Sequence, residues 1–440
     1  MSPRQLIVKL LDRFERSNAY ADIILETELR EQKLSEKNKG LIQEIFFGII
    51  RWRNRLDWII KKIYHGQLEK TPRFIRYILQ IALYQLIFMD RIPEYAAIHE
   101  AVELAKIKGG TYWGKKVNAI LRSFQRSEHK IDFPELSTNP VEFIAVYYSH
   151  PEWMVQRWIE RFGIDDTILL CEANNKTPLL SLRVNTIKIS VQELQSRLAQ
   201  VDVLTSQSPY LKNFIQAQNL PDLSQFQSFQ EGLFSIQDVS AGLACVLLSP
   251  RPGDKIVDLC AAPGGKTTFL AELTKDEADI FAVDANLQRL NLIRQNLNRL
   301  KLKSVQLVQA DGTQYSSQKV DKLIVDAPCS GLGVLSKRVD LRWKRTPGQL
   351  EELSELQLKL LQNAAKLVKP GGVIVYCTCT IEPEENEQIV DKFLIENKNF
   401  RLEPASKFIS KELTTSEGFV YTLPHQHGID GSFAARLIKL

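Results

Sequence analysis

The chain has 440 residues, of which 44% are hydrophobic and 25% are charged. These proportions are typical of a globular protein with two or three domains, and they exclude a disordered or fibrous chain. The longest apolar runs are too short to span a bilayer, and charges within the first dozen residues argue against a signal peptide. Six sparse cysteines favour a reducing cytoplasm over a disulfide scaffold, and no cysteines or histidines have the spacing of a metal site.

The net charge of +5 is unevenly distributed along the chain. Residues 1–130 carry 24 Lys and Arg against 15 Asp and Glu, whereas the remaining residues carry 33 against 37. A basic first third attached to a mildly acidic remainder favours an anionic partner such as a nucleic acid. A solvated helical surface without a partner is the alternative interpretation.

Residues 1–130 have the apolar spacing of helices throughout, and Pro72, Pro93 and Gly109-Gly110 separate the periodic segments. We therefore expect a compact all-α bundle. Within it, tryptophans alternate with basic residues: Trp52 and Trp58 stand among Arg51, Arg53, Arg55, Lys61 and Lys62. Interleaved bases and indoles can grip phosphates and stack nucleobases. Alternatively, both tryptophans belong to the core and the basic residues are solvated.

Residues 131–235 contain shorter elements, with helices predicted over 153–162 and 191–198 and a strand over 180–185. We interpret this stretch as a small α/β connector. From residue 236 to 440, strands alternate with helices, and strands are predicted over 255–259, 280–283, 305–308, 322–325 and 373–376. This alternation predicts a Rossmann-like, doubly wound parallel sheet, whose ligands bind beyond the carboxyl ends of the strands. The expected fold is thus multidomain, with the all-α bundle and the connector preceding this α/β domain.

The first predicted strand of that sheet runs into DLCAAPGGKTT, residues 258–268. Gly264 and Gly265 allow a ligand to approach the backbone closely, just before a helix whose N-terminus attracts negative charge. The second strand ends at Asp284, twenty residues after Gly264, where an acid can accept both hydroxyls of a ribose. Asp311 follows the third strand and suits an adenine amino group. These residues predict a cofactor that contains a nucleoside.

The GGKTT sequence is not a Walker A loop, because Cys260 occupies the position where that motif requires a glycine. Pro263 would also interrupt the run of N–H groups that cradles phosphates in such loops. A dinucleotide oxidoreductase is disfavoured as well, since the chain has no G-x-G-x-x-G motif.

Two cysteines follow the carboxyl ends of neighbouring predicted strands. Cys329 lies in DAPCSGLG, residues 326–333, and Cys379 lies in YCTCT, residues 376–380. Both stand among small polar residues on the ligand side of the sheet, and thiolate attack with an acid nearby is a recurrent catalytic arrangement. We interpret the remaining strand cysteines as small apolar core residues: Cys245, Cys260 and Cys377.

Together, DLCAAPGGKTT, DAPCSGLG and the Thr-Cys pair followed by PEEN resemble the RNA cytosine-C5 methyltransferases of the Sun (Fmu) family. The resemblance extends upstream, where RIPEYAAIHEAVELAK and VNAILRSF look like the NusB-like RNA-binding domain of that family. It implies S-adenosylmethionine as the cofactor and 16S ribosomal RNA as the substrate. DNA cytosine methyltransferases use a Pro-Cys nucleophile, the counterpart of Cys329, so the additional Thr-Cys pair favours Cys379 as the nucleophile and RNA as the substrate.

The resemblance also implies a role for each matching residue. Cys379 would add to C6 of cytosine, and Cys329 would help to remove the C5 proton. Asp326 would contact the N3/N4 edge of the base, in protonated form stabilising charge at N3, and would border the cofactor as well. Asp284 would bind the cofactor ribose, and the adenosyl and methionine parts would be held by Asp311 and by Cys260, Ala261, Ala262, Pro263, Gly264, Gly265 and Lys266. Substrate positioning is a second role open to Lys266.

The sequence departs from the family after DAPCSGLG, where two arginines and a Pro-Asp pair are common. Residues 336–340 here read SKRVD, so the acid at Asp340 and the following Arg342-Trp343 are retained, whereas the proline and one arginine are lost. This loss weakens the expectation of a stiff loop and a phosphate contact. Two other functions stay open: methylation of transfer RNA, and RNA binding by an assembly factor without catalysis. We expect a monomer, because no heptad seam is present, and we interpret His425 and His427 as residues of a solvated loop.

Overall fold

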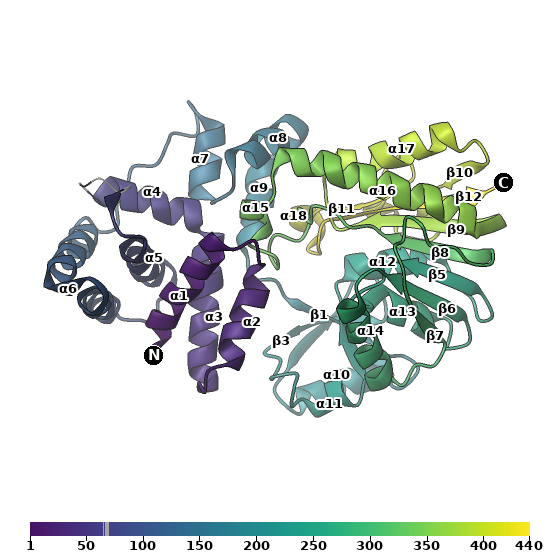
Figure 1. Cartoon of the computed structure of the whole chain (residues 1–440), viewed down its shortest axis with the longest axis horizontal. Helices are drawn as coiled ribbons and strands as arrows, with labels where there is room; N and C mark the ends of the chain where they lie inside the picture. Colours follow the sequence, from purple (N-terminus) through teal and green to yellow (C-terminus); the bar gives the residue numbers. More distant parts are fainter. Residues whose placement is uncertain (65, 67–69) are drawn as a thin grey trace. The chain divides into compact units, whose positions relative to one another are not determined.

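The computed structural model describes residues 1–64, 66 and 70–440, which form two compact units (Figure 1). The helical unit comprises residues 1–176 and 338–344, and the sheet unit comprises residues 177–337 and 345–440. In the part of the chain that the structure describes, no helix combines the length and apolar character needed to cross a membrane. The same residues contain no group of three or more His, Cys, Asp or Glu side chains that could hold a metal ion.

The helical unit confirms the helices predicted for the first third of the chain. Its long elements are α1 (Pro3–Arg16), α2 (Ala21–Arg30), α3 (Glu36–Arg51), α4 (Arg53–Ile63), α5 (Arg73–Phe88), α6 (Glu94–Arg126), α7 (Pro140–Tyr147), α8 (Glu152–Phe162) and α9 (Ile164–Asn175). Helix α1 starts with a capping box, in which Ser2 and Gln5 each accept a hydrogen bond from the backbone N–H of the other.

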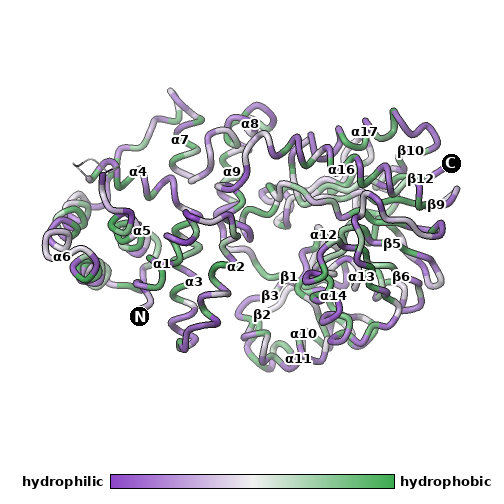
Figure 2. Tube along the Cα trace, viewed as in Figure 1, coloured by the Kyte–Doolittle hydropathy of each residue, from purple (hydrophilic) through white to green (hydrophobic). Residues whose placement is uncertain are grey.

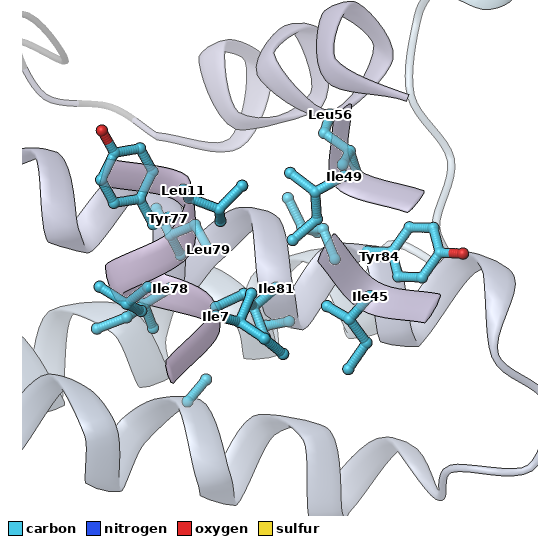
Figure 3. Close-up of a cluster of buried hydrophobic side chains, with 14 of the residues drawn as sticks. Ile7, Leu11, Ile45, Ile49, Leu56, Tyr77, Ile78, Leu79, Ile81 and Tyr84 are labelled. Carbon is cyan, nitrogen blue, oxygen red and sulfur yellow. The ribbon is translucent and has the colours of Figure 1, made fainter. Parts of the chain in front are cut away.

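Most of these helices bury one face, whereas α5 is buried on all sides over residues 77–85. Hydrophobic and hydrophilic residues alternate along the helices in the short rhythm expected for amphipathic segments (Figure 2). In the core, Ile7 and Leu11 of α1 lie with Ile45 of α3 and Ile81 of α5 (Figure 3). The predicted break at Gly109-Gly110 is a kink within α6, because Gly110 has φ 80° and ψ 178°, a conformation that strains any other residue.

The alternating tryptophans and basic residues of α3 and α4 mostly contact other parts of the helical unit. Trp52 stacks on Phe88 with ring centroids 4.8 Å apart, and the Arg55 guanidinium lies 4.3 Å from the Tyr147 ring. Further contacts of this cluster are Arg53 with Glu15, Trp58 with the Asp132 carbonyl, and Lys62 with the Trp58 ring. The structure therefore favours the core interpretation for Trp52 and intramolecular partners for Arg55, while residues 61 and 62 are exposed.

Residues 338–344 belong to the helical unit although they follow DAPCSGLG in the sequence. Val339 lies in the core of that unit, and Asp340 accepts a hydrogen bond from the Ala21 N–H at 2.9 Å. Arg342, in the short helix α15 (Leu341–Lys344), is fully buried. It donates to the Ser149 carbonyl at 3.1 Å, the Asn174 carbonyl at 3.2 Å and the Asn175 side-chain oxygen at 2.8 Å. The segment 338–344 thus has a structural use within the helical unit.

Replacing Arg342 with methionine should destabilise the helical unit, because buried carbonyls would lose their donors. We expect the free energy of unfolding to fall by about 2–4 kcal/mol, measured by urea unfolding followed by tryptophan fluorescence. Arg338→Met is the matched control, since Arg338 is partly exposed and lies 3.7 Å from the exposed Asp22. Its effect should stay below about 1 kcal/mol. An equal decrease in the free energy of unfolding in the two variants would contradict a structural role specific to Arg342.

The sheet unit begins with a small antiparallel sheet whose strands lie in the order β2-β3-β1-β4. Its elements are β1 (Leu180–Val184), α10 (Val191–Ala199), β2 (Leu204–Gln207), β3 (Phe214–Gln218), α11 (Gln227–Gln230) and β4 (Phe234–Ile236). Leu182 and Phe234 pack against Leu194 of α10 in a separate core. The predicted strand at 180–185 and helix at 191–198 are confirmed, whereas β2, β3 and β4 were not predicted.

The large sheet has the strand order β10-β12-β9-β8-β5-β6-β7, and β11 pairs with β12. The predicted parallel strands are confirmed as β5 (Lys255–Leu259), β6 (Asp279–Asp284), β7 (Val305–Gln309), β8 (Val320–Asp326) and β9 (Val368–Thr378). Three unpredicted strands add antiparallel pairs, so the sheet is mixed: β10 (Phe400–Glu403), β11 (Val420–Thr422) and β12 (Ser432–Lys439).

Helices cover both faces of the large sheet. Helices α12 (Val239–Leu248), α13 (Gly265–Leu273) and α14 (Leu287–Leu300) share one core with Ile256 of β5. Helices α16 (Pro347–Leu367) and α17 (Glu387–Glu396) share the other with Val257, the next residue along β5. Side chains alternate along a strand, so neighbouring residues serve opposite cores. With both faces buried, the loops after the strands are where polar groups can gather.

Candidate active site

The loops that follow β5, β8 and β9 lie next to one another, because β8 pairs with both of the other strands. Asp326 is the last residue of β8 and stands opposite Cys377 of β9 in the strand register. The loop 260–264 follows β5, and Cys379 directly follows β9. The order of the strands therefore gathers, at one edge of the sheet, residues that are far apart in the sequence.

Cys329 and Cys379 face each other with their sulfur atoms 3.3 Å apart. The backbone N–H of Cys379 also donates to the Cys329 sulfur at 3.4 Å. Both thiols are free, and Cys379 is exposed whereas Cys329 is partly buried. The structure thus brings together the two cysteines that the sequence singles out, and it leaves Cys379 exposed.

The two thiols differ in acidity. Their mutual hydrogen bond lowers the pKa of Cys379 and raises the pKa of Cys329, so the shared proton stays on Cys329. The Glu385 carboxylate adds to the rise at Cys329, while the Lys266 cation helps to lower the pKa of Cys379 and Asp326 opposes this. The exposed sulfur is therefore the more acidic of the two, so it forms the thiolate, which is the form that attacks carbon, more readily than Cys329 does.

Asp326 forms an ion pair with Lys266, with 2.7 Å between Oδ1 and Nζ. Burial works to lower the pKa of Lys266, but the charge of Asp326 and the nearby Cys377 outweigh it and hold the pKa above its usual value. Lys266 is therefore a cation, and it faces the Asp326 side chain directly.

Glu385, in the short helix η2 (Pro383–Glu385), supports the loop that carries Cys329. Its buried carboxylate accepts hydrogen bonds from the Ser330 N–H at 2.8 Å, from the Ser330 hydroxyl, and from Gln357 at 2.9 Å. From the other side, Arg345 donates to the carbonyls of Ser330 at 2.8 Å and Cys329 at 3.2 Å. Sequence reasoning missed both supports. The PEEN motif was the one available signal for Glu385, whereas nothing local marks Arg345.

The loop after β5 turns sharply before α13. Cys260 and Gly264 both have positive φ, 61° and 97°, and a Cβ atom on Gly264 would lie 3.0 Å from Ile293. Helix α13 begins at Gly265, and no side chain of the described residues caps its N-terminus. The first N–H groups of this helix therefore have no side-chain acceptor among the described residues, and uncapped N–H groups of this kind suit a carboxylate. The remaining loop residues are Ala261, Ala262 and Pro263.

Asp284 and Asp311 border this loop. Asp284 is 5% exposed and accepts hydrogen bonds from the Ala262 N–H at 3.1 Å and the Asn286 N–H at 2.9 Å. Asp311 is exposed and follows β7, and a Cβ atom on the adjacent Gly312 would lie 3.7 Å from the Cys260 sulfur. The acids predicted for a nucleoside therefore flank the glycine turn predicted for the rest of the cofactor, and this donor and acceptor set fits such a ligand.

His425 and His427 lie outside this site. They belong to a single helical turn, α18 (Pro424–His427), where a solvated loop was predicted. The His427 ring contacts the backbone of Leu423 and Glu412.

Three family models match the chain. The NusB family matches residues 1–126, the ferredoxin-like domain of RsmF/B-like methyltransferases matches residues 150–220, and 16S rRNA methyltransferase RsmB/F matches residues 245–438. These matches confirm the predicted succession of an all-α part, an α/β connector and a Rossmann-like sheet, and they identify the connector as ferredoxin-like.

Relatives with similar sequences span the chain from end to end. A probable ribosomal RNA small subunit methyltransferase B of Synechocystis sp. is 35% identical over the whole of both chains. One of Bacillus subtilis is 32% identical over all of this chain and 99% of its own. The ribosomal RNA small subunit methyltransferase B of Yersinia pseudotuberculosis is 34% identical over 93% of this chain and 92% of its own.

Solved structures match as well. The crystal structure of PH0851 has a TM-score of 0.82 and 28% identity, and the match covers 100% of this chain and 99% of that one. The structure of NSun6 from Pyrococcus horikoshii with SFG, an S-adenosylmethionine analogue, has a TM-score of 0.60 and 27% identity. That match covers 66% of this chain and 98% of the other.

Cys379 should be the cysteine that iodoacetamide alkylates fastest, because it is exposed and Cys329 lowers its pKa. In Cys329→Ala this donor is lost, and the pH midpoint of Cys379 alkylation should rise by about one unit, the equivalent of one hydrogen bond. Mass spectrometry of peptides alkylated over a pH series measures the midpoint. Cys377→Ala is the matched control, because Cys377 is buried and donates to the Val325 carbonyl at 3.5 Å. An unchanged midpoint in Cys329→Ala would contradict the acidity difference.

The buried carboxyl group of Asp258, near the end of β5, should make the free energy of unfolding of the protein fall as pH rises. Burial raises its pKa to about 7 from an ordinary 3.8, although the Thr267 hydroxyl donates to it at 2.6 Å. Because the folded-state pKa is the higher one, the stabilising contribution is complete below about pH 4 and lost as pH rises through about 7. Asp258→Asn should therefore flatten the melting temperature between about pH 5 and pH 8. If the melting temperature fell equally steeply with pH in the wild type and in Asp258→Asn, the contribution of Asp258 would be refuted.

Proposed function

Because the chain belongs to the RsmB/F family of ribosomal RNA small subunit methyltransferases, we propose that it methylates C5 of a cytosine in 16S ribosomal RNA. The observation that carries this proposal is the cysteine pair, whose sulfur atoms lie 3.3 Å apart with the exposed one more acidic. In such a reaction an enzyme nucleophile adds to the pyrimidine ring and is eliminated again after methyl transfer. This needs a nucleophile and a proton acceptor side by side. This pair supplies both.

S-adenosylmethionine is the cofactor of this family, and when bound it supplies an electrophilic methyl group. We propose that the uncapped N-terminus of α13 and the loop 260–266 hold its methionine part. The Asp284 carboxylate would accept hydrogen bonds from the ribose hydroxyls, and the Asp311 carboxylate would accept from the adenine amino group.

The Cys379 thiolate attacks C6 of the cytosine. A bond forms between the sulfur and C6, and the electron pair of the C5–C6 double bond moves to C5, which becomes nucleophilic enough to accept the methyl group. The target base must leave its stack to reach the sulfur. A nucleotide in a single-stranded loop does so at lower cost than one in a helix, so a loop cytosine is the expected substrate.

Cys329 then acts on the C5 proton. Once the Cys379 sulfur is bonded to carbon it carries no negative charge, so the hydrogen bond that raises the pKa of Cys329 is gone. Cys329 can release its own proton to solvent and accept the one from C5. Loss of that proton restores the C5–C6 double bond, breaks the bond between sulfur and C6, and returns the Cys379 thiolate.

Asp326 and Lys266 would read the polar edge of the base. The carboxylate can accept a hydrogen bond from the N4 amino group of cytosine, and the ammonium can donate to N3 or O2. Uracil presents a carbonyl oxygen in place of that amino group, which a carboxylate would repel. The ion pair thus supports cytosine over uracil, and it gives Lys266 the substrate role that the sequence left open.

Each part of the chain would have its own task in this reaction. Residues 1–130 would bind RNA, residues 131–235 would connect, and residues 236–440 would bind the cofactor and catalyse. The net charge of residues 1–130 supports the first assignment, since phosphate contacts dominate affinity for nucleic acids.

We propose a cytoplasmic enzyme, because both catalytic thiols must stay reduced. A monomer stays a prediction.

Two alternatives differ in substrate or in activity. A transfer RNA methyltransferase would use the same site, and the names of the relatives favour ribosomal RNA over it. An assembly factor without catalysis would not require two adjacent thiols of opposite acidity, and this favours the enzyme.

Unmodified 16S ribosomal RNA incubated with labelled S-adenosylmethionine should acquire 5-methylcytosine. In Cys379→Ala, product and covalent adduct should both disappear, a loss of about 10³-fold or more, because the nucleophile is gone. In Cys329→Ala, an RNA adduct should accumulate on denaturing gels, because the C5 proton stays in place. Nucleoside analysis of the labelled RNA identifies the product.

Cys377→Ala should retain activity and serves as the matched control for a cysteine near the same edge of the sheet. An adduct that persists in Cys379→Ala and vanishes in Cys329→Ala would reverse the two roles. Label in transfer RNA but not in ribosomal RNA would favour the first alternative. Cofactor binding without methyl transfer to any RNA would favour the second.

A further inference from the structure

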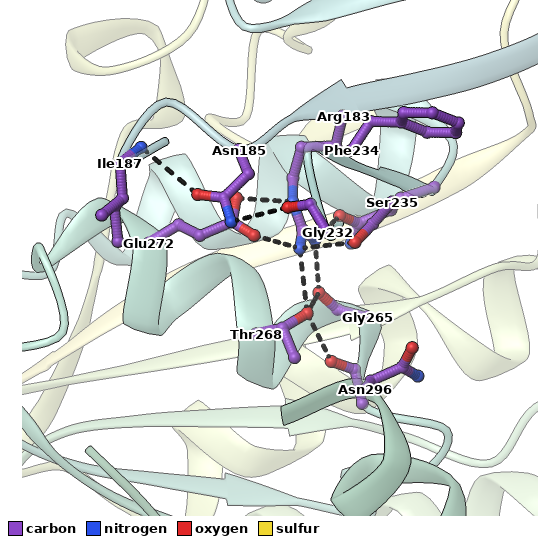
Figure 4. Close-up of polar contacts among 12 residues, drawn as sticks. Arg183, Asn185, Ile187, Gly232, Phe234, Ser235, Gly265, Thr268, Glu272 and Asn296 are labelled. Atoms are coloured by element: carbon purple, nitrogen blue, oxygen red, sulfur yellow. Dashed lines mark hydrogen bonds and ion pairs between the residues drawn. The ribbon is translucent and has the colours of Figure 1, made fainter. Parts of the chain in front are cut away.

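Arg183 is a fully buried cation in β1 of the small antiparallel sheet, outside the strands that carry the catalytic residues. Its guanidinium reaches across to α13, where it donates to both carboxylate oxygens of Glu272, at 2.9 and 2.8 Å (Figure 4). It also donates to the Thr268 hydroxyl at 2.9 Å and to the Gly265 carbonyl at 2.7 Å. The three acceptors lie along one face of α13, so a single side chain fixes the helix at its start, middle and end.

The contact with Gly265 bears on the cofactor. Gly265 is the first residue of α13 and follows the positive-φ residue Gly264, and no side chain caps this helix end. A donor held on the Gly265 carbonyl therefore sets where the open N–H groups of the first turn point. Arg183 thus determines the geometry of the part of α13 that is proposed to hold the methionine end of S-adenosylmethionine.

Gln237 extends this arrangement. Its side-chain oxygen accepts a hydrogen bond from Arg183, and its backbone N–H donates to the Ser181 carbonyl of β1 at 3.1 Å. Its side-chain Nε2 is buried and has no hydrogen-bond partner among the described residues. That nitrogen lies 3.5 Å from the position that a Cβ atom on Gly265 would occupy. Buried donors without a partner are rare and costly, so this N–H points to a ligand beside Gly265.

We infer that Arg183 is a positioning residue for S-adenosylmethionine: it anchors the N-terminus of α13 and orients Gln237, whose free N–H donates to the methionine end of the cofactor. The small antiparallel sheet is therefore part of the cofactor site. The inference rests on the proposed function in one respect, the assignment of the loop 260–266 to this cofactor.

A purely structural role is the competing explanation, since Arg183 and Glu272 form a buried ion pair. Buried ion pairs can often be replaced by apolar residues of similar volume without loss of stability. The variant Arg183→Met/Glu272→Leu uses this property, because it removes the charges together and keeps the volume. If Arg183 served stability alone, this variant would bind the cofactor as wild type does.

The experiment measures binding of S-adenosylhomocysteine to the full chain by isothermal titration calorimetry, with the melting temperature recorded for each variant. In Arg183→Met/Glu272→Leu, the dissociation constant should rise by about tenfold or more while the melting temperature stays within a few degrees of wild type. Gln237→Leu should weaken binding about tenfold, the effect of one lost hydrogen bond to the ligand. Both variants should raise KM for S-adenosylmethionine and leave KM for RNA unchanged.

Glu272→Gln is the matched control, because it breaks the ion pair but leaves Arg183 on Gly265 and Gln237. Its affinity for S-adenosylhomocysteine should stay within about threefold of wild type even if its melting temperature drops. Wild-type affinity in both Arg183→Met/Glu272→Leu and Gln237→Leu would overturn the inference and leave the proposed function intact. Failure of the wild-type protein to bind S-adenosylhomocysteine would instead overturn the cofactor assignment itself, and the inference with it.

Discussion

The pairing of β8 with β5 on one side and with β9 on the other is the constraint on which the candidate site depends. These three strands are buried on both faces, so polar and reactive groups can gather only where the strands end. The end of β8 supplies Asp326, the loop after it supplies Cys329, and the residue after β9 is Cys379. A change in strand order would separate the two sulfur atoms by at least the spacing of a strand, although every residue would be retained.

Strand order places the loops near one another, and the hydrogen bonds of buried charged side chains then hold each loop in one conformation. Glu385 accepts three hydrogen bonds around the Cys329 loop, and Arg183 donates to three residues of α13. A buried charge is costly unless its hydrogen bonds are satisfied, so each group favours one arrangement and penalises the others. Both networks therefore contribute geometry more than stability, which is what a site with tight distances requires.

The sequence predicts those parts of the fold that depend on local pattern. The strands β5 to β9 are apolar runs that alternate with helices, and their parallel pairing follows from that rhythm. Strand β12 is not predicted from the sequence, because Arg436 interrupts its apolar run. The burial of Arg436 makes sense only next to Glu403 of β10, which accepts from it at 2.8 Å, and that pairing joins residues 33 positions apart.

The same reason explains what sequence reasoning missed at the site and beyond it. The motifs single out Cys329, Cys379 and Asp326, because short runs of small residues after a strand are a local signal. Arg183 and Arg342 carry no such signal, since an arginine in a sequence is ordinarily exposed. Their burial depends on acceptors that tertiary structure supplies from distant segments, and no periodicity within a strand or helix can reveal them.

The division of labour between the two thiols follows from where each one sits. Two equivalent cysteines at this distance would share a proton evenly, and neither would be a committed nucleophile. The pair is not equivalent, because Cys379 is exposed while Cys329 is partly buried near the Glu385 carboxylate, which disfavours a second negative charge there. When the pair loses one proton, the negative charge therefore resides on the Cys379 sulfur, the one that a substrate can reach. The remaining proton is held by Cys329, which has to be deprotonated only after Cys379 has formed a bond to carbon.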